Sequence, residues 1–86
     1  MEYKSINQMT QEFKSRISDE ITAKEIQDEL RKMGYLNKRN LPTAKTIMGV
    51  ECKEAHDIRG RLYYKWEPYI VDEVGDRLFE KYFPIK

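Results

Sequence analysis

The chain has 86 residues, which is enough for one domain with a modest core and leaves no material for a second domain. Its composition is 40% hydrophobic and 36% charged, with six Tyr, three Phe and one Trp, which excludes a disordered chain. The net charge of +1 gives no argument from overall charge for binding to nucleic acid or to an acidic membrane. Any electrostatic argument for a partner therefore has to be local.

Cys52 is the only cysteine, so an intrachain disulfide is excluded and a reducing, cytoplasmic compartment is favoured. We expect its side chain to be a small buried or half-buried hydrophobic group, not a reactive thiol. The N-terminus lacks the basic start and apolar run of a signal peptide. No apolar stretch approaches the roughly 20 residues that cross a bilayer. The expectation is a soluble protein that is not exported.

Two helices are predicted in the first 34 residues. The first begins at Ser5, which forms a capping box with Gln8. The second begins with a capping box in which the Thr22 hydroxyl and the Glu25 carboxylate reciprocally bond free backbone amides, and Gly34 is its left-handed C-cap. The predicted inward-facing side chains are Ile6, Met9, Phe13 and Ile17 in the first helix and Ala23, Ile26, Leu30 and Met33 in the second.

A third, short helix is predicted over residues 43–48. Pro42 is favourable at a helix start, Thr43 is a suitable N-cap and Gly49 is a stop. The link from Gly34 to Pro42 is longer than the turn of a compact helix-turn-helix, which leaves the orientation of this helix open.

Beyond Gly49 the pattern alternates, which predicts a strand from Val50, a turn over residues 57–60 and a second strand over 61–66. These two strands form a β-hairpin. Pro68 opens a last helix that closes at Pro84. Its apolar face contains Val71, Val74, Leu78 and Tyr82, with Phe79 and Phe83 adjacent, and Gly75 is a weak point within it.

The order of elements is therefore helix, capped helix, short helix, hairpin and helix. The residues that define it are Ile21 to Ile26 with Leu30 and Gly34, then Leu41 to Ile47, then Arg59 to Tyr64. On these residues the chain resembles the winged helix-turn-helix superfamily over residues 5–66. The resemblance implies an α+β, mostly helical domain covering residues 1–86, with the two-stranded hairpin as the wing and 67–86 as an additional C-terminal helix. A narrower likeness is to the small winged domains of phage and mobile-element replication proteins.

Positive charge concentrates in the segment that this resemblance assigns to the third helix and the wing. Residues 35–65 contain seven bases and three acids, a net charge of +4, whereas both flanking segments are net acidic. If this segment docks on DNA, the side chains of Thr43, Lys45 and Thr46 would enter the major groove from the third helix. The side chains that would contact phosphates are Lys38, Arg39, Arg59, Arg61 and Lys65. The alternative is that these charges only form a solvated surface.

The aromatic residues of the hairpin also allow two interpretations. Tyr64 and Trp66 share one face of the strand, where we expect them to pack the hairpin against the helices. Tyr63 lies on the other face beside Lys65, where it is either a further packing residue or a platform for an unpaired base.

No catalytic or metal site is predicted. Cys52 and His56 provide two of the four ligands of a structural zinc site, and no orienting group accompanies them for nucleophilic chemistry. The four glycines are scattered and form no phosphate-binding loop. We expect the paired carboxylates to lie at helix starts or on polar faces, and these are Asp19/Glu20, Asp28/Glu29 and Asp72/Glu73. The expectation is therefore neither an enzyme nor a cofactor-binding protein.

Two functions remain. The first is binding to double- or single-stranded DNA, as a regulator or as a replication or recombination accessory of a bacterial, phage or mobile-element genome. The second is an interaction module that recruits a polymerase, a helicase or a second copy of itself through a helical face, such as that of the aromatic C-terminal helix, or through the hairpin edge.

Overall fold

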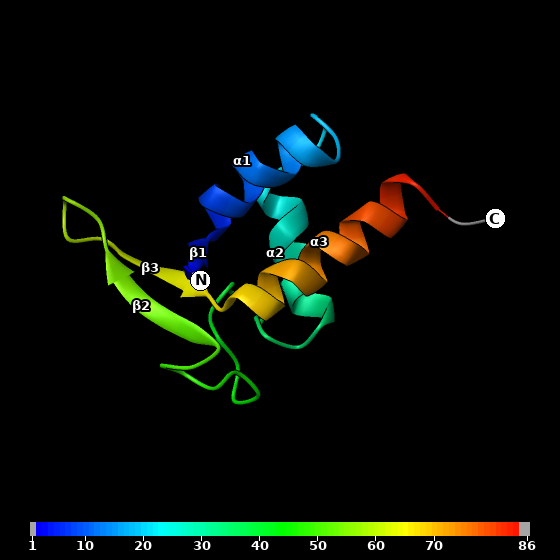
Figure 1. Cartoon of the computed structure of the whole chain (residues 1–86). Coiled ribbons are helices and arrows are strands. Elements are labelled where there is room, and N and C mark those ends of the chain that lie inside the picture. The colour runs from blue at the N-terminus through cyan, green and yellow to red at the C-terminus, as the bar shows by residue number, and fades with distance from the viewer. Residues whose placement is uncertain (1, 85–86) are drawn as a thin grey trace.

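A computed structural model of the chain describes residues 2–84. Over this range the fold is α+β, with one antiparallel sheet of strand order β1-β3-β2. In Figure 1 the β2–β3 hairpin projects from the helical body, and the C-terminal end of α3 lies at the far side of the molecule. The helices are α1 (Ile6–Arg16), α2 (Ala23–Lys32) and α3 (Pro68–Tyr82), and the strands are β1 (Lys4–Ser5), β2 (Cys52–His56) and β3 (Leu62–Trp66).

The first two helices begin where the sequence predicts. The predicted capping box of α1 is confirmed, because the Gln8 amide donates to Ser5 Oγ at 3.1 Å and the Ser5 amide donates to Gln8 Oε1 at 2.8 Å. At α2 the Glu25 amide donates to the Thr22 hydroxyl at 3.2 Å. The Glu25 carboxylate accepts hydrogen bonds from two side chains of α3 instead of from the Thr22 amide, so half of this predicted box is wrong.

The last helix is confirmed, including its glycine. Glu67 caps α3 and Pro68 stands in its first turn. A Cβ on Gly75 would lie 3.0 Å from Cε1 of Phe13, which is itself buried. The missing side chain therefore lets α1 and α3 approach closely, and this contact offsets the low helix propensity of glycine.

The core lies between the helices and the end of the sheet next to β1. Its largest side chain is that of Trp66, which is fully buried and meets the Tyr35 ring edge-on at a centroid distance of 6.2 Å. Cys52 is also fully buried, which confirms its predicted role as a small hydrophobic group. Burial of each large side chain contributes roughly 1.5–3 kcal/mol to stability. The other fully buried side chains are Met9, Ile21, Ile26, Leu30, Ile70, Val74 and Leu78.

The predicted hairpin is present, and a third strand extends it. The Gly60 amide donates to the Asp57 carbonyl at 2.9 Å, and Gly60 has φ +78°, which favours glycine at this turn. The first hairpin strand begins at Cys52 and not at Val50. The sequence did not predict β1, whose Lys4 and Ser5 pair with Trp66 and Lys65 of β3.

The helix predicted over residues 43–48 is absent. This segment forms turns, and Leu36 and Pro42 form an isolated antiparallel bridge ahead of it. The predicted helical start fails because Thr43 and Thr46, which a helix would expose on its first turn, bind backbone carbonyls of the residues that follow α2. Tertiary hydrogen bonds thus replace the local ones.

Candidate nucleic-acid interface

The three predicted base-reading side chains are bound to the end of α2. Thr43, Lys45 and Thr46 donate side-chain hydrogen bonds at 2.5, 2.7 and 2.8 Å, respectively. Lys45 Nζ also lies 5.0 Å from the centroid of the Tyr35 ring, and Thr46 is only 6% exposed. The acceptors are the backbone carbonyls of Gly34, Met33 and Tyr35, in the same order. The prediction that these residues enter a major groove required a helix and unbound side chains. The segment has neither, because it forms turns and its side chains are bound to carbonyls.

Two predicted phosphate ligands, Lys38 and Arg39, lie in an exposed turn. Asn37 Oδ1 accepts the amides of Arg39 at 2.8 Å and of Leu41 at 3.1 Å, which fixes the turn. Within residues 2–84 neither Lys38 nor Arg39 forms an ion pair, so both cations are available to a partner.

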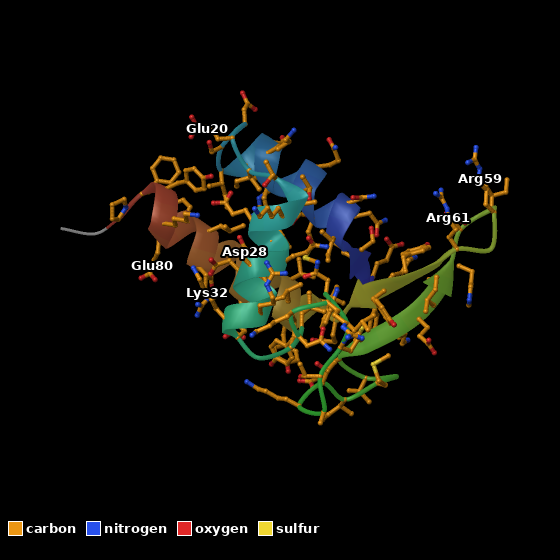
Figure 2. The ribbon with its side chains drawn as sticks, turned by 180° about the vertical axis from the view of Figure 1, so that it is seen from behind. Glu20, Asp28, Lys32, Arg59, Arg61 and Glu80 are labelled. Atoms are coloured by element: carbon orange, nitrogen blue, oxygen red, sulfur yellow. The ribbon has the colours of Figure 1, made fainter. Side chains whose placement is uncertain are left out.

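Arg59 and Arg61 lie at the tip of the hairpin, remote from Glu20 and Glu80 at the other end of the molecule (Figure 2). Asp57 organises this tip, because its carboxylate accepts the amides of Arg59 and Arg61 and an ion pair from Arg61 Nε, each at 2.8–2.9 Å. The hydrogen bond from the Arg61 amide, followed by those from the Arg61 side chain and the Arg59 amide, holds the pKa of Asp57 below its ordinary value. Arg61 is thus partly engaged, whereas Arg59 makes no ion pair with a described residue.

The sheet has one face packed on the helices and one face turned away from them. Directly opposite residues of an antiparallel pair project on the same side, so Tyr63 and Lys65 share a face with Ala55 and Lys53. Tyr3 belongs to this side as well, because Lys53 Nζ lies 4.1 Å from the centroid of its ring. We call the surface formed by Tyr3, Lys53, Tyr63 and Lys65 the outer face.

Lys53 and Lys65 stand directly opposite each other on the outer face. Like charges in this position destabilise a sheet, and neither ammonium group forms an ion pair with a described residue. Tyr64 and Trp66 lie on the other face, where Trp66 is buried and Tyr64 packs against the core, as predicted. The half-buried Tyr63 is therefore free of the packing role that its neighbours have.

A groove of about 710 Å³, which the sequence did not predict, lies between the hairpin and the body. Three parts of the chain meet there: the start of α1, the Leu36–Leu41 loop with α2, and β3. Trp66 forms part of its lining, and the buried indole N–H of Trp66 has no acceptor among the described residues. Lys65 links this groove to the outer face.

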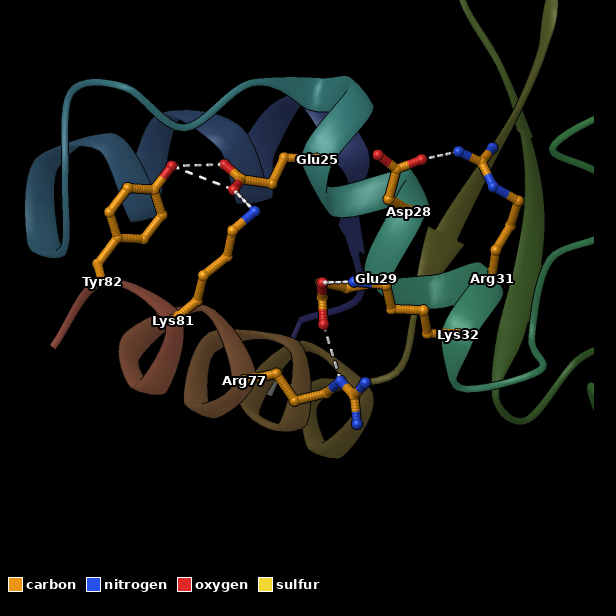
Figure 3. A network of polar contacts seen from close by, with 8 residues as sticks. All are labelled: Glu25, Asp28, Glu29, Arg31, Lys32, Arg77, Lys81 and Tyr82. Carbon is orange, nitrogen blue, oxygen red and sulfur yellow. Dashed lines mark hydrogen bonds and ion pairs between the residues drawn. The ribbon is translucent and has the colours of Figure 1, made fainter. Parts of the chain in front are cut away.

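A network of polar side chains connects α2 to α3 and holds the two helices together (Figure 3). The Glu29 carboxylate accepts Arg77 Nε at 2.9 Å and Lys32 Nζ at 3.3 Å. Burial raises the pKa of Glu29, but the hydrogen bonds and charges of these two cations outweigh it, so the net pKa is lowered. The expectation that Glu29 lies on a polar face is wrong, because it is only 5% exposed. Nothing in the sequence around Arg77, in the third helical turn of α3, indicates this contact.

The cysteine and the histidine of the chain both belong to β2. Burial, with a smaller effect of the Glu54 charge, raises the pKa of the Cys52 thiol to about 12. His56 is exposed, at the far end of β2 from Cys52. Residues 2–84 contain no group of three or more His, Cys, Asp or Glu side chains arranged to hold a metal ion. In the same range, none of the helices combines the length and the apolar character needed to cross a bilayer.

Comparisons of the chain with family models, with curated proteins and with solved structures find no match. The functional assignment therefore depends on the site itself.

Proposed function

We propose that this protein binds single-stranded nucleic acid, DNA in the first instance, across the outer face and the hairpin tip. The observation that carries the proposal is the pair of lysines, Lys53 and Lys65, opposed on one sheet face without a carboxylate partner. This arrangement costs stability in the free protein, and a bound phosphate relieves the repulsion. Tyr63 and Tyr3 stand on the same face and supply rings on which bases stack.

Single strands fit this surface better than a duplex does. The helix that a helix-turn-helix would insert into a major groove is replaced by turns, and its polar side chains are bound to carbonyls. The hairpin supports the winged interpretation, because Arg59 and Arg61 extend from its tip (Figure 2), where we propose that they contact phosphates. Aromatic rings can reach base faces only in unpaired strands. A preference for single strands favours a replication or recombination accessory over a regulator.

Fluorescence anisotropy with a labelled oligothymidylate and with a duplex, each at two salt concentrations, tests the proposal. We expect tighter binding to the single strand. Changing Lys53 and Lys65 together to Gln should lower the salt slope by roughly 1.4, since about 0.7 counterion is released per single-strand phosphate. The same change should alter stability little, because it removes a repulsion together with the contact of Lys53 over the Tyr3 ring.

The matched control changes Lys14 and Lys24, two exposed lysines of the helical body, to Gln. This variant should bind as the wild type does. Tyr63→Leu should weaken single-strand binding at least fivefold, given about 1–3 kcal/mol per stacked base. Equal losses in the test and control variants, or no binding of either oligonucleotide at low salt, would end the proposal.

A second candidate function rests on a separate observation at the end of α3. Phe79 and Phe83 are 53% and 52% exposed, and their ring centroids are 5.0 Å apart. Such an exposed aromatic pair favours contact with a protein partner or with a second copy of this chain. Light scattering during size-exclusion chromatography tests the second copy. A dimer that dissociates when both residues are changed to Ser supports it, and a monomer at every concentration excludes it.

A further inference from the structure

The two edges of the sheet are protected in different ways. On the free edge of β2, the Cys52 carbonyl accepts the Gly49 amide at 2.7 Å, and the exposed polar side chains of Glu54 and His56 follow. On the other side of β3, pairing with β1 stops at Ser5, opposite Lys65, because the chain turns there into α1. Within residues 2–84, therefore, the first half of β3 has no strand beside it on this side.

The hydrogen-bond pattern identifies which backbone groups are unpaired. The Asp57 amide donates to the Arg61 carbonyl, and the Glu67 amide donates to the Glu51 carbonyl, so the odd-numbered residues of this strand face β2. Leu62 and Tyr64 are even-numbered and direct their amides to the opposite side. The amides of Leu62 and Tyr64 and the carbonyl of Leu62 thus face away from β2, past the end of β1.

This edge lies along the 710 Å³ groove, which is open to solvent on one side. Ser5 to Gln8 and the Leu36–Leu41 loop contribute the lining that faces β3. Leu41 and Leu62, 44% and 47% exposed, are both part of its lining and can contact an apolar side chain between them. The amide side chains of Asn7, Gln27 and Asn40 add hydrogen-bonding groups to the walls.

We propose that the groove accepts an extended segment of another polypeptide, which adds to β3 as a strand beyond the end of β1. An extended backbone is the ligand whose N–H and C=O groups repeat at the spacing of a strand edge. β1 already occupies the same edge at Trp66 and Lys65, so the incoming strand continues an existing ladder. Pairing between the β3 edges of two copies is disfavoured, because each edge lies along its own groove.

The charges near the groove specify the partner further. Lys65 is part of the lining, and Lys38 and Arg39 belong to the turn whose Asn40 forms the opposite wall. Among the described residues of the lining, Asp57 alone has a carboxylate, and it is already bound by Arg61 and by backbone amides. The partner segment therefore has an apolar residue that contacts the two leucines and acidic residues that flank it.

Amide hydrogen exchange on the free protein is the first part of the test. The amides of Tyr63 and Lys65, which pair with β2, should exchange slowly, whereas those of Leu62 and Tyr64 should exchange fast. Slow exchange at Leu62 and Tyr64 in the free protein would overturn the proposal, because the edge would then be closed.

The second part selects binders from a phage-displayed library of random decapeptides and maps them by NMR. We expect peptides with an apolar residue between acidic ones, and protection of the Leu62 and Tyr64 amides on binding. Leu62→Pro removes the amide that faces the groove and reduces the apolar side chain there, and it should weaken binding about tenfold. Leu62→Val keeps the amide and is the matched control, which should bind within about twofold of the wild type.

A readout on the peptide keeps the test valid if Leu62→Pro fails to fold. Two sets of peptides are N-methylated at alternate residues, one at odd and one at even positions. The set whose methylated amides face β3 should lose binding, and the other set should keep it. The proposal is overturned if no peptide is enriched, if the enriched peptides shift resonances elsewhere, or if both methylated sets bind equally. It is also overturned if oligothymidylate protects the Leu62 and Tyr64 amides, since the groove would then belong to the nucleic-acid site.

Discussion

Two segments with similar polar residues differ in what their side chains do. In residues 43–46 the hydroxyls and the ammonium group are bound to backbone carbonyls beside α2. At the hairpin tip Arg59 and Arg61 extend from a turn that Asp57 organises, far from the core. Both segments were predicted to contact DNA. The difference teaches that a polar side chain is available to a partner only if no unsatisfied backbone group lies within its reach.

The largest effect on stability is expected at Thr46. Thr46→Val keeps the shape of the side chain but removes its buried hydrogen bond to the Tyr35 carbonyl, which then keeps only the Thr43 amide at 3.1 Å. We expect a loss of about 1.5 kcal/mol in the free energy of unfolding, at the upper end for one buried hydrogen bond, measured by denaturant titration. Thr46→Ser keeps the hydroxyl and should lose less. If Thr46→Val is as stable as the wild type but loses binding to DNA, the residue belongs to the interface after all.

A smaller effect, dependent on pH, is expected at Glu29. Its pKa is lowered in the folded state, so the stabilisation is complete above the unfolded pKa of about 4.3 and is lost as the pH falls through the folded value. Glu29→Gln should cost about 1 kcal/mol at pH 7, because Arg77 and Lys32 are open to solvent. The cost should shrink below pH 4. Asp28→Asn, at a neighbouring surface pair, is the control and should cost less at every pH.

A change at Lys45 tests most directly whether residues 43–46 are structural or contact DNA. Lys45→Met removes the hydrogen bond to the Met33 carbonyl and the contact over Tyr35. Since the side chain is exposed, we expect a loss of about 0.5–1 kcal/mol in thermal unfolding and no change in sequence preference on DNA. Altered discrimination between oligonucleotides would restore Lys45 to the base-reading role that its position in the sequence suggested.

At the hairpin tip, the effect on stability should be the smallest and the effect on binding the largest. Changing Arg59 and Arg61 together to Ala should leave the melting temperature nearly unaltered, apart from the exposed pair with Asp57. Binding should weaken for all sequences alike, and the salt slope should fall by about 1–2. Unchanged affinity and salt slope would make these arginines spectators, and unfolding would make them structural.

The features predicted from the sequence are those set by neighbouring residues. The Ser5–Gln8 capping box and the turn at Gly60 each need only a few consecutive residues, and the structure has both. The segment after Pro42 has equally good local signals for a helix, yet acceptors contributed by a remote part of the chain prevent it. Glu25 likewise bonds to α3 and not to its own helix start.

In the candidate site too, the features set by neighbouring residues could be predicted from the sequence, and those that depend on distant segments could not. The outer-face position of Tyr63 and Lys65 follows from strand alternation, which is a local rule. The opposition of Lys53 and Lys65 depends on the hairpin register, and Tyr3 joins them only because β1 pairs with β3. The groove requires three separated segments at once, and no local pattern contains it.

The single cysteine has a practical consequence for experiments on all of these variants. Cys52 is fully buried in the sheet beside β3, and its thiol stays protonated at neutral pH. Alkylating reagents attack the thiolate, so labelling has to wait for a conformational opening that exposes the strand. The rate of modification by iodoacetamide therefore reports how often β2 separates from the core, in a wild-type chain without an engineered probe. Mass spectrometry then ranks the variants by the frequency of that opening, including variants too scarce for calorimetry.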